Sequence, residues 1–188
     1  MKIGVLSLQG DFREHIEMLK KCSVNAVEVR LPEDLKGVDG LIIPGGESTA
    51  IGKLMQQYGL DREIIKKHNK GMSIYGTCAG AILLSKNIVR SGQPRLNLLD
   101  VSIKRNDYGR QADSFESELN IDGIGKFNGI FIRAPVIEKV NNGAKILAKL
   151  NDRPVLIQDK NILASTFHPE LTGDKRVHEY FIKIVKSN

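Results

Sequence analysis

The chain has few cysteines and no tryptophan. Its 188 residues include two cysteines, Cys22 and Cys78, and no Cys or His spacing typical of a metal site. Two cysteines cannot form the disulfide framework of small secreted domains. We therefore expect a reducing cytoplasm as the compartment, and no metal site. Cys22 shares a helical face with Phe12, Ile16 and Leu19, so we interpret it as a packed core residue without a chemical role.

Long hydrophobic runs are also missing. No stretch approaches the roughly 18 apolar residues that a membrane span needs. The short apolar run at 3–8 is not followed by a signal-like cleavage site, so we expect neither a membrane span nor a secretory leader. Internal repeats and linker-like segments are absent from the sequence. With 41% hydrophobic residues, the composition predicts one core and a single domain over residues 1–188.

Charge of one sign is not concentrated anywhere in the chain. The formal net charge is +6, but lysines and arginines are spread along the sequence, mostly beside acidic residues. Aromatic residues, which stack on bases, make up 5% of the chain. Because nucleic-acid-binding proteins cluster their basic residues, we expect no nucleic-acid partner. The surplus is typical of a solvated surface, and it also suits docking to an acidic protein.

Short β-branched runs alternate with helical patterns in the first half of the chain. This alternation predicts a parallel sheet with crossover helices. The expected strands are 3–8, 26–30, 40–43 and 72–75, with one helix from about residue 12 and further helices within 49–69.

The second half contains strand patterns with few helical patterns between them. We therefore expect antiparallel or mixed strands added to the parallel sheet. Segments 91–97 and 106–118 lack periodicity and are predicted to be loops. Apolar residues at helical spacing from Val177 indicate a final helix. The expected strands are 100–105, 129–133, 145–150, 154–158 and 162–167.

One cysteine lies between two glycines where an apolar run ends. Gly76-Thr77-Cys78-Ala79-Gly80 is the thiol counterpart of the strand-to-helix elbow that exposes a nucleophile. The helix that follows would direct its first N–H groups at the sulfur and favour the thiolate. The alternative is a buried cysteine in an ordinary turn. Cys78 also follows a strand end, where open α/β sheets bind ligands.

A histidine and a glutamate follow the strand expected at 162–167. In an extended chain His168 and Glu170 project the same way, so the carboxylate can orient the imidazole as a base for a thiol. The alternative is a surface histidine with an acidic neighbour by chance. The other histidines, His15, His68 and His178, lie in polar helical contexts and are predicted to be solvated.

The segment 44–49, Pro-Gly-Gly-Glu-Ser-Thr, follows the strand expected at 40–43. Its glycines let backbone N–H groups converge on an anion, either a phosphate or a tetrahedral oxyanion. No lysine follows them as in a phosphate-binding loop. We therefore favour an oxyanion hole formed by the N–H groups of Gly46 and Ala79 over an ordinary strand-to-helix turn.

These three motifs, in this order, resemble those of triad glutamine amidotransferases. Further segments make the chain similar to the glutaminase subunits of pyridoxal phosphate synthases, from Ile3 to His178. The resemblance implies a flavodoxin-like three-layer α/β fold. The further segments are Leu8-Gln9-Gly10, Arg105-Asn106, Gly109-Arg110-Gln111, Asp113-Ser114-Phe115-Glu116 and Phe131-Ile132-Arg133-Ala134-Pro135.

The resemblance implies hydrolysis of L-glutamine through a thioester on the cysteine. It implies a catalytic triad of Cys78, His168 and Glu170 and no cofactor. The pattern itself places Arg105 on the inward face of its strand and Arg133 at the end of an apolar run, where a charge needs a partner. That partner is either the ligand or an internal ion pair. The glutamine pocket implied by the resemblance consists of Gly46, Glu47, Ser48, Arg105, Ile132 and Arg133.

The resemblance also implies a partner. The ammonia would pass through a tunnel to a separate TIM-barrel synthase subunit, and the chain alone would be weakly active or inactive until it docks. The expected contact loops are 9–11 and 106–116. The nearest alternatives are a related cysteine hydrolase and the glutaminase subunit of another amidotransferase, such as one serving imidazole glycerol phosphate synthesis. Others are a non-catalytic binding or regulatory module and a flavodoxin-like redox protein.

Overall fold

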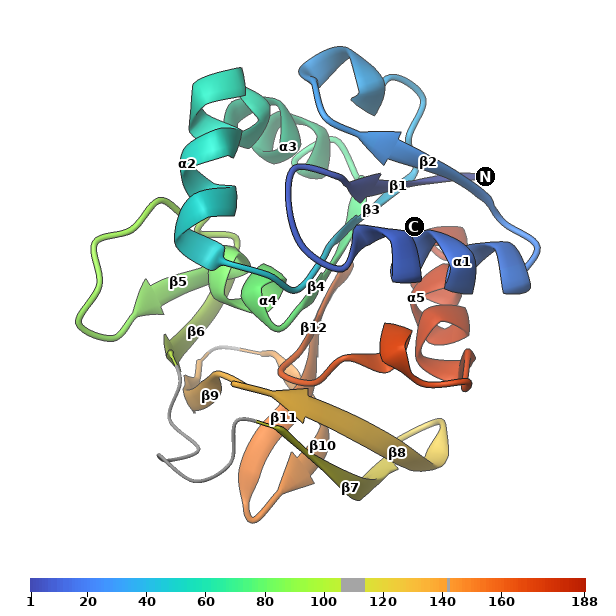
Figure 1. Cartoon of the computed structure of the whole chain (residues 1–188), viewed down its shortest axis with the longest axis vertical. Helices are drawn as coiled ribbons and strands as arrows, with labels where there is room; N and C mark the ends of the chain where they lie inside the picture. The colour runs from blue at the N-terminus through green and yellow to red at the C-terminus, as the bar shows by residue number, and fades with distance from the viewer. Residues whose placement is uncertain (106–113, 142) are drawn as a thin grey trace.

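A seven-stranded sheet runs through the centre of the molecule (Figure 1). The structure is a computed structural model and describes residues 1–105, 114–141 and 143–188. The strands of this sheet are β1 Lys2–Leu6, β2 Asn25–Val29, β3 Gly40–Ile43, β4 Ser73–Thr77, β10 Lys145–Leu150, β11 Arg153–Asp159 and β12 Ile162–Ser165. The order is β10-β11-β12-β4-β3-β1-β2, with antiparallel pairs at β10-β11-β12 and parallel pairs elsewhere.

Helices cover both faces of this sheet. Helices α1 Phe12–Lys21 and α5 Arg176–Lys186 lie on one face, and α2 Ser48–Tyr58, α3 Leu60–His68 and α4 Ala79–Leu84 on the other (Figure 1). Strand residues alternate between the two cores: Ile42 packs on the α1 and α5 side, whereas Leu41 and Ile43 pack on the opposite side. The expected three-layer α/β fold is confirmed, and the parallel order β2-β1-β3-β4-β12 is flavodoxin-like.

Additional strands pack below the carboxyl ends of the parallel strands in Figure 1. They are β5 Ser85–Ile88, β6 Leu99–Lys104 and β9 Val136–Val140 in one sheet and β7 Ser114–Ile121 and β8 Gly125–Ile132 in a hairpin. The expected mixed region is therefore present, but the prediction of a loop over 106–118 was wrong for 114–118. Segment 106–113 lies outside the described residues. Strand β7 is polar and largely exposed, so its hydrophobic pattern is weak.

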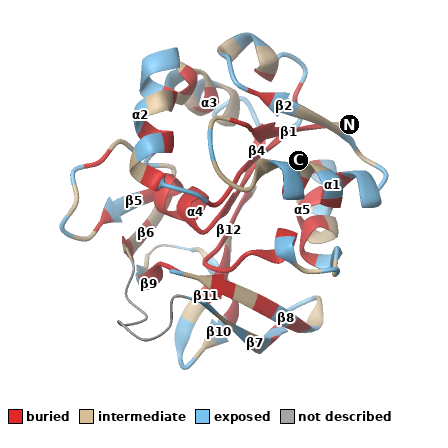
Figure 2. Ribbon diagram, viewed as in Figure 1, coloured by how far each residue is buried: buried red, intermediate tan, exposed pale blue. Residues whose placement is uncertain are grey.

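The connections between elements include two 3₁₀ turns, η1 Pro32–Leu35 and η2 Pro169–Leu171. The helical region expected within 49–69 is divided at Gly59, whose φ of 71° ends α2 and begins α3. Figure 2 shows that the central strands β1, β4 and β12 are buried between the helices.

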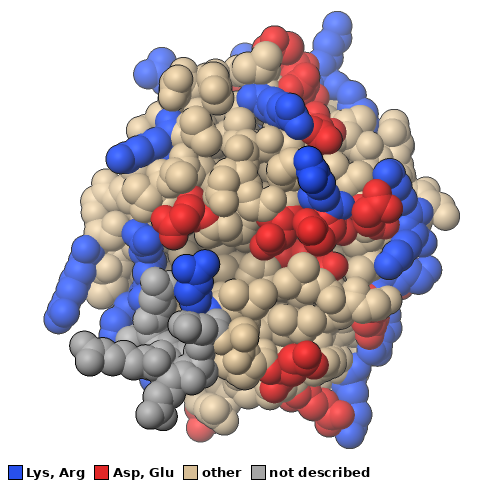
Figure 3. All heavy atoms as spheres, in the orientation of Figure 1, with Lys and Arg blue, Asp and Glu red and all other residues tan. Residues whose placement is uncertain are grey.

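Charged side chains are interspersed on the surface. In the face shown in Figure 3, Lys and Arg are spread across the molecule among Asp and Glu. Several form exposed ion pairs, such as Lys20–Glu17 at 2.7 Å and Lys66–Glu63 at 3.1 Å. This distribution agrees with the solvated surface expected from the sequence. Within the described residues, no helix combines the length and the apolar character needed to cross a membrane.

Candidate active site

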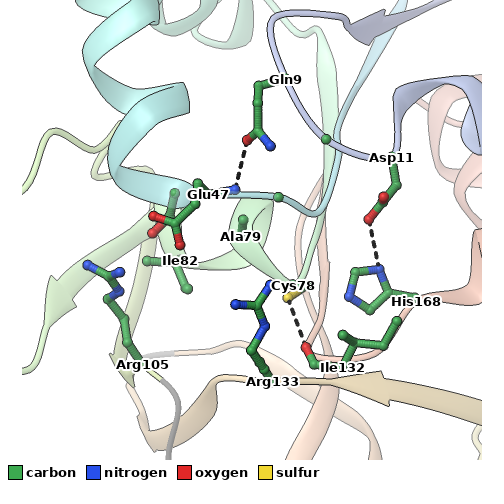
Figure 4. Close-up of a pocket in the computed structure, with 13 residues that line it drawn as sticks. Gln9, Asp11, Glu47, Cys78, Ala79, Ile82, Arg105, Ile132, Arg133 and His168 are labelled. Carbon is green, nitrogen blue, oxygen red and sulfur yellow. Dashed lines mark hydrogen bonds and ion pairs between the residues drawn. The ribbon is translucent and has the colours of Figure 1, made fainter. Parts of the chain in front are cut away.

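Four loops meet where the neighbouring parallel strands β12, β4, β3 and β1 end. With the ends of β6 and β8 they enclose a cavity of about 280 Å³ (Figure 4). Nine of the residues expected at the site line it, whereas Glu170 lies behind His168. The nine are Gly46, Glu47, Ser48, Cys78, Ala79, Arg105, Ile132, Arg133 and His168, and the lining is completed by Gln9, Gly10, Asp11 and Ile82.

Cys78 stands at a strained turn between β4 and α4. Its φ of 47° and ψ of −101° lie where a residue with a side chain is rarely found. The flanking glycines make the turn possible. A Cβ on Gly80 would lie 2.0 Å from the carbonyl oxygen of Ile43, and one on Gly76 would lie 2.6 Å from the backbone carbon of Gly80. The Gly-x-Cys-x-Gly pattern thus reflects close backbone packing that holds the thiol at the cavity.

The thiol of Cys78 is directed at the opposite wall in this state. Its Sγ lies 4.0 Å from the carbonyl oxygen of Ile132, and the side chain is largely buried (Figure 4). The residue is therefore shielded from bulk solvent but open to the cavity.

The loops after β1 and β3 pack directly on each other. The N–H of Asp11 donates to the carbonyl of Gly45 at 3.2 Å, and a Cβ on Gly10 would lie 1.8 Å from that oxygen. The side-chain Oε1 of Gln9 accepts the N–H of Glu47 at 2.8 Å (Figure 4). Gly46 adopts a φ of 144°, which suits glycine. These contacts fix the backbone of the predicted anion-binding loop.

His168 and Glu170 form a buried pair. The Nδ1 of His168 donates to Oε1 of Glu170 at 2.7 Å, and both side chains are buried. The contact agrees with the sequence prediction, but the assumed extended chain does not. Strand β12 ends at Ser165, and Glu170 lies in the η2 turn, so a tight turn rather than strand alternation brings the carboxylate to the ring.

The environment of this pair favours a charged imidazole. Burial alone lowers the pKa of His168, but Cys78 and Glu170 outweigh it and raise that pKa to about 10. Burial raises the pKa of Glu170, and the hydrogen bond from His168 opposes this rise. The Nε2 atom of His168 has no hydrogen-bond partner among the described residues. The ring is therefore oriented by Glu170 through one nitrogen and left free to exchange a proton through the other.

A second carboxylate, Asp11, lies beside the same ring. Its Oδ2 is 3.5 Å from Nδ1 of His168 (Figure 4). Asp11, His168 and Glu170 offer atoms within 4.8 Å of one another, the arrangement that a metal ion would require. However, Nδ1 of His168 and Oε1 of Glu170 already bind each other at 2.7 Å. This geometry fits a base held by carboxylates better than a metal centre.

The two arginines expected in the pocket lie on its outer wall. Arg105 follows β6 and donates from Nη1 to Gln93 Oε1 at 2.7 Å and to Thr49 Oγ1 at 3.1 Å. Arg133 follows β8 with a φ of 41° and is exposed. Within the described part of the chain, neither arginine forms an ion pair of the kind considered as the alternative. Both line the cavity, Arg105 with Nη1 held by Gln93 and Thr49 (Figure 4).

Sequence reasoning missed several residues around the site. Gln9, Gly10 and Asp11 were expected at a partner interface, yet they line the cavity. The rule that strand ends carry the ligand site also applies to the loop after β1, and it could have identified them. The prediction that His15 and His178 are solvated was wrong, because both are fully buried behind the site.

Comparisons with known proteins agree with this geometry. The model of the SNO glutamine amidotransferase family matches residues 5–187. The chain is 52% identical to pyridoxal 5′-phosphate synthase subunit PdxT of Thermus thermophilus, covering 97% of this chain and 96% of that protein. It is 49% identical to PdxT of Thermotoga maritima, covering 99% and 100%.

Solved structures give the same result. A crystal structure described as a glutamine amidotransferase superposes with a TM-score of 0.96 at 50% identity, covering 98% of each chain. A structure described as PurLQS from Thermotoga maritima shares only the fold, with a TM-score of 0.71 at 15% identity over 97% of each chain. The match over nearly the whole sequence establishes that this chain belongs to the SNO glutamine amidotransferase family.

Proposed function

We propose that residues 1–188 act as one glutaminase domain, which hydrolyses L-glutamine and supplies the ammonia for pyridoxal 5′-phosphate synthesis. The observation that carries this proposal is the elbow at Cys78 facing the buried pair of His168 and Glu170 in one cavity. Relatives of about half identity, named as subunits of pyridoxal 5′-phosphate synthase, support the destination of the ammonia.

The reaction begins with the thiolate of Cys78. Its sulfur attacks the side-chain amide carbon of glutamine and forms a tetrahedral oxyanion. The imidazolium of His168 then donates its Nε2 proton to the departing nitrogen, and ammonia leaves a thioester on Cys78. Water attacks the thioester while the now neutral His168 accepts a proton, and glutamate is released. Glu170 holds the imidazole ring in place through both steps.

Backbone N–H groups would stabilise the oxyanion. Ala79 supplies one as the first residue of α4, directly after the nucleophile, and Gly46 supplies the second from the loop after β3. The free amino acid has an ammonium and a carboxylate, and the cavity offers groups of both signs. Glu47 suits the ammonium, whereas Arg105 and Arg133 suit the carboxylate. Ser48 and Ile132 complete the wall around the substrate.

The partner in this proposal is a TIM-barrel synthase subunit that receives the ammonia through a protein tunnel. The thiol directed at Ile132 suits a site that becomes fully active on docking. The isolated chain should therefore hydrolyse glutamine weakly. Full activity of the chain alone, unchanged by the synthase subunit, would contradict this part.

A covalent label tests the proposal. A diazoketone analogue of glutamine, incubated with the chain and a synthase subunit, should modify Cys78 and no other residue, as read by peptide mass mapping. The second cysteine, Cys22, is the internal control because it lies outside the cavity. Cys78→Ala should take no label. Labelling of Cys22 instead, or equal labelling of the Cys78→Ala variant, would reject the proposed nucleophile.

A further inference from the structure

Two fully buried histidines lie directly behind the catalytic pair, and the reaction above does not use them. His15 is on α1 and His178 is on α5, the two helices that lie side by side on one face of the sheet (Figure 1). Apolar residues of similar size would fill this space without the cost of burying polar rings. Their presence therefore calls for a specific role.

His178, His15 and Glu170 form a chain of polar contacts inside the core. Nδ1 of His15 lies 2.9 Å from Nε2 of His178. Nε2 of His15 lies 3.0 Å from Oγ1 of Thr77 and 3.5 Å from Oε2 of Glu170. Thr77 immediately precedes the nucleophile Cys78, so His15 contacts Glu170 directly and the neighbour of Cys78 in the chain.

The hydrogen-bond pattern indicates which nitrogens carry protons. Nδ1 of His178 is buried with no partner among the described residues. A proton on that atom would be a buried donor without an acceptor, which is costly, whereas a bare lone pair is tolerated better. His178 is then protonated at Nε2 and donates to Nδ1 of His15. This leaves the proton of His15 on Nε2, the atom that faces Thr77 and Glu170.

The second carboxylate oxygen of Glu170 needs such a donor. Its Oε2 atom is buried, and no described residue forms a full hydrogen bond with it. Burial raises the pKa of Glu170, and it lowers the pKa of both His15 and His178, so these rings stay neutral. A neutral N–H at 3.5 Å lowers the energy of the ionised carboxylate without adding a buried charge.

The groups that face His15 come from every element around it. Tyr75 and Thr77 face it from β4, His178 from α5 and Glu170 from η2, with His168 beyond. Tyr75 packs edge-on to both rings, and its hydroxyl is held by Ser165 at 2.9 Å. Within the described residues, Nε2 of His15 is therefore the donor best placed to reach Oε2 of Glu170.

We propose that His15 is a positioning residue, oriented by His178, whose Nε2–H keeps Glu170 ionised and its other oxygen on His168. The inference rests on the proposed glutaminase function. In this inference the two buried histidines act on the catalytic base His168 through Glu170, and they do not contact glutamine. His15 does not line the cavity, so its loss should act on the chemical step and leave substrate binding in place.

The first test uses the unmodified chain. Imidazole ¹⁵N shifts report the tautomer of each histidine, and the proposal requires the Nε2–H tautomer of His15 at neutral pH. The Nδ1–H tautomer would overturn it. This measurement needs no variant, so it stands even if a substitution in the core prevents folding.

The second test compares variants in complex with a synthase subunit. His15→Leu should lower kcat for glutamine on the order of tenfold, the loss expected for one hydrogen bond to a charged group, with KM unchanged. It should also lower the titration midpoint of His168 by roughly one pH unit or more. His15→Gln, whose amide can donate near the Nε2 position, should restore most of both. His68→Leu is the control, because His68 lies at the distant end of α3.

The outcomes separate this inference from the function on which it rests. A folded His15→Leu variant with the wild-type kcat and His168 titration overturns the positioning role. Equal losses in His15→Leu and His15→Gln, with His168 titrating as before, also overturn it, because they indicate a structural role only. A wild-type complex that releases no ammonia from glutamine instead contradicts the proposed function.

Discussion

The imidazole of His168 lies 2.7 Å from the carboxylate of Glu170, and both side chains are buried. A charge-assisted hydrogen bond of this length fixes the ring plane and leaves Nε2 facing the thiol side of the cavity. Burial would otherwise favour a neutral imidazole, so the two acidic neighbours, Cys78 and Glu170, determine its charge. The chemistry of the site depends on that balance.

The first prediction concerns the charge of His168. Because Cys78 and Glu170 raise its pKa to about 10, the ring should remain protonated through neutral pH in the free chain. Glu170→Gln removes one cause and should lower the titration midpoint. Histidine titration followed by NMR checks both. A midpoint near 6.5 in the unmodified chain would show that Cys78 and Glu170 do not outweigh the effect of burial on His168.

The second prediction concerns stability in acid. Burial lowers the pKa of His178 to about 3 and also lowers that of His15, so the unfolded chain binds more protons than the folded one below about pH 6.5. The free energy of unfolding should therefore fall as pH decreases from about 6.5 towards 3, by up to ~1.4 kcal/mol per pH unit for each histidine. Well below pH 6.5 His168 adds no slope, because it is protonated in both states there, whereas near pH 6.5 the unfolded chain begins to lose that proton and His168 opposes the slope.

Urea unfolding between about pH 4.5 and 6.5 measures this slope. His178→Leu should reduce the pH dependence of the free energy of unfolding by the contribution of about one bound proton. His68→Leu, which removes a histidine from the end of α3, is the matched comparison for the fold. Identical slopes in the wild type and in His178→Leu would exclude a buried neutral His178.

The third prediction concerns the elbow. A Cβ on Gly80 would meet the backbone oxygen of Ile43 at 2.0 Å, so Gly80→Ala forces α4 away from β3. We expect a loss of roughly 3 kcal/mol in the free energy of unfolding and loss of activity, because Cys78 moves with the helix. Gly173→Ala is the control, since a Cβ there meets nothing within 4 Å. Equal stability of the two variants in urea would contradict the packing argument.

The fourth prediction concerns glutamine binding. Arg105→Met removes a charge from the cavity wall and should raise KM by about 10- to 100-fold, the effect of one hydrogen bond to a charged group. The value of kcat should change little, because Arg105 is remote from the thiol in Figure 4. Arg95→Met is the control, since Arg95 does not line the cavity. An unchanged KM in Arg105→Met would assign this arginine to structure alone.

Much of the fold follows from periodicity. The buried strands β1, β3 and β4 are continuous apolar runs, and the elbow at Cys78 is recognisable because two glycines flank it. The exposed strand β7 is different: it pairs with β8 in a hairpin, but most of its residues are polar and half are exposed, so no clear apolar pattern marks it as a strand. Helix α5 follows from its apolar positions, but His178, predicted to be solvated as a polar residue, lies on the same buried face.

At the site, too, local motifs were predictable from the sequence, whereas contacts between distant residues were not. Motifs placed Cys78, His168 and Glu170 on the strand ends, and the sheet order brought those ends together. The burial of His15 could not be read locally, because its neighbours Arg13, Glu14 and Glu17 are polar and its partner His178 is 163 residues away. Contacts between residues so far apart in sequence appear only once the sheet is assembled.

Ammonia release from glutamine by the chain with a synthase subunit tests the central claim most directly. The wild type should release ammonia and glutamate in equal amounts. Cys78→Ala should release none while keeping the circular dichroism and thermal unfolding of the wild type. Release by Cys78→Ala at the wild-type rate would contradict the account, because the thiol could then not be the nucleophile.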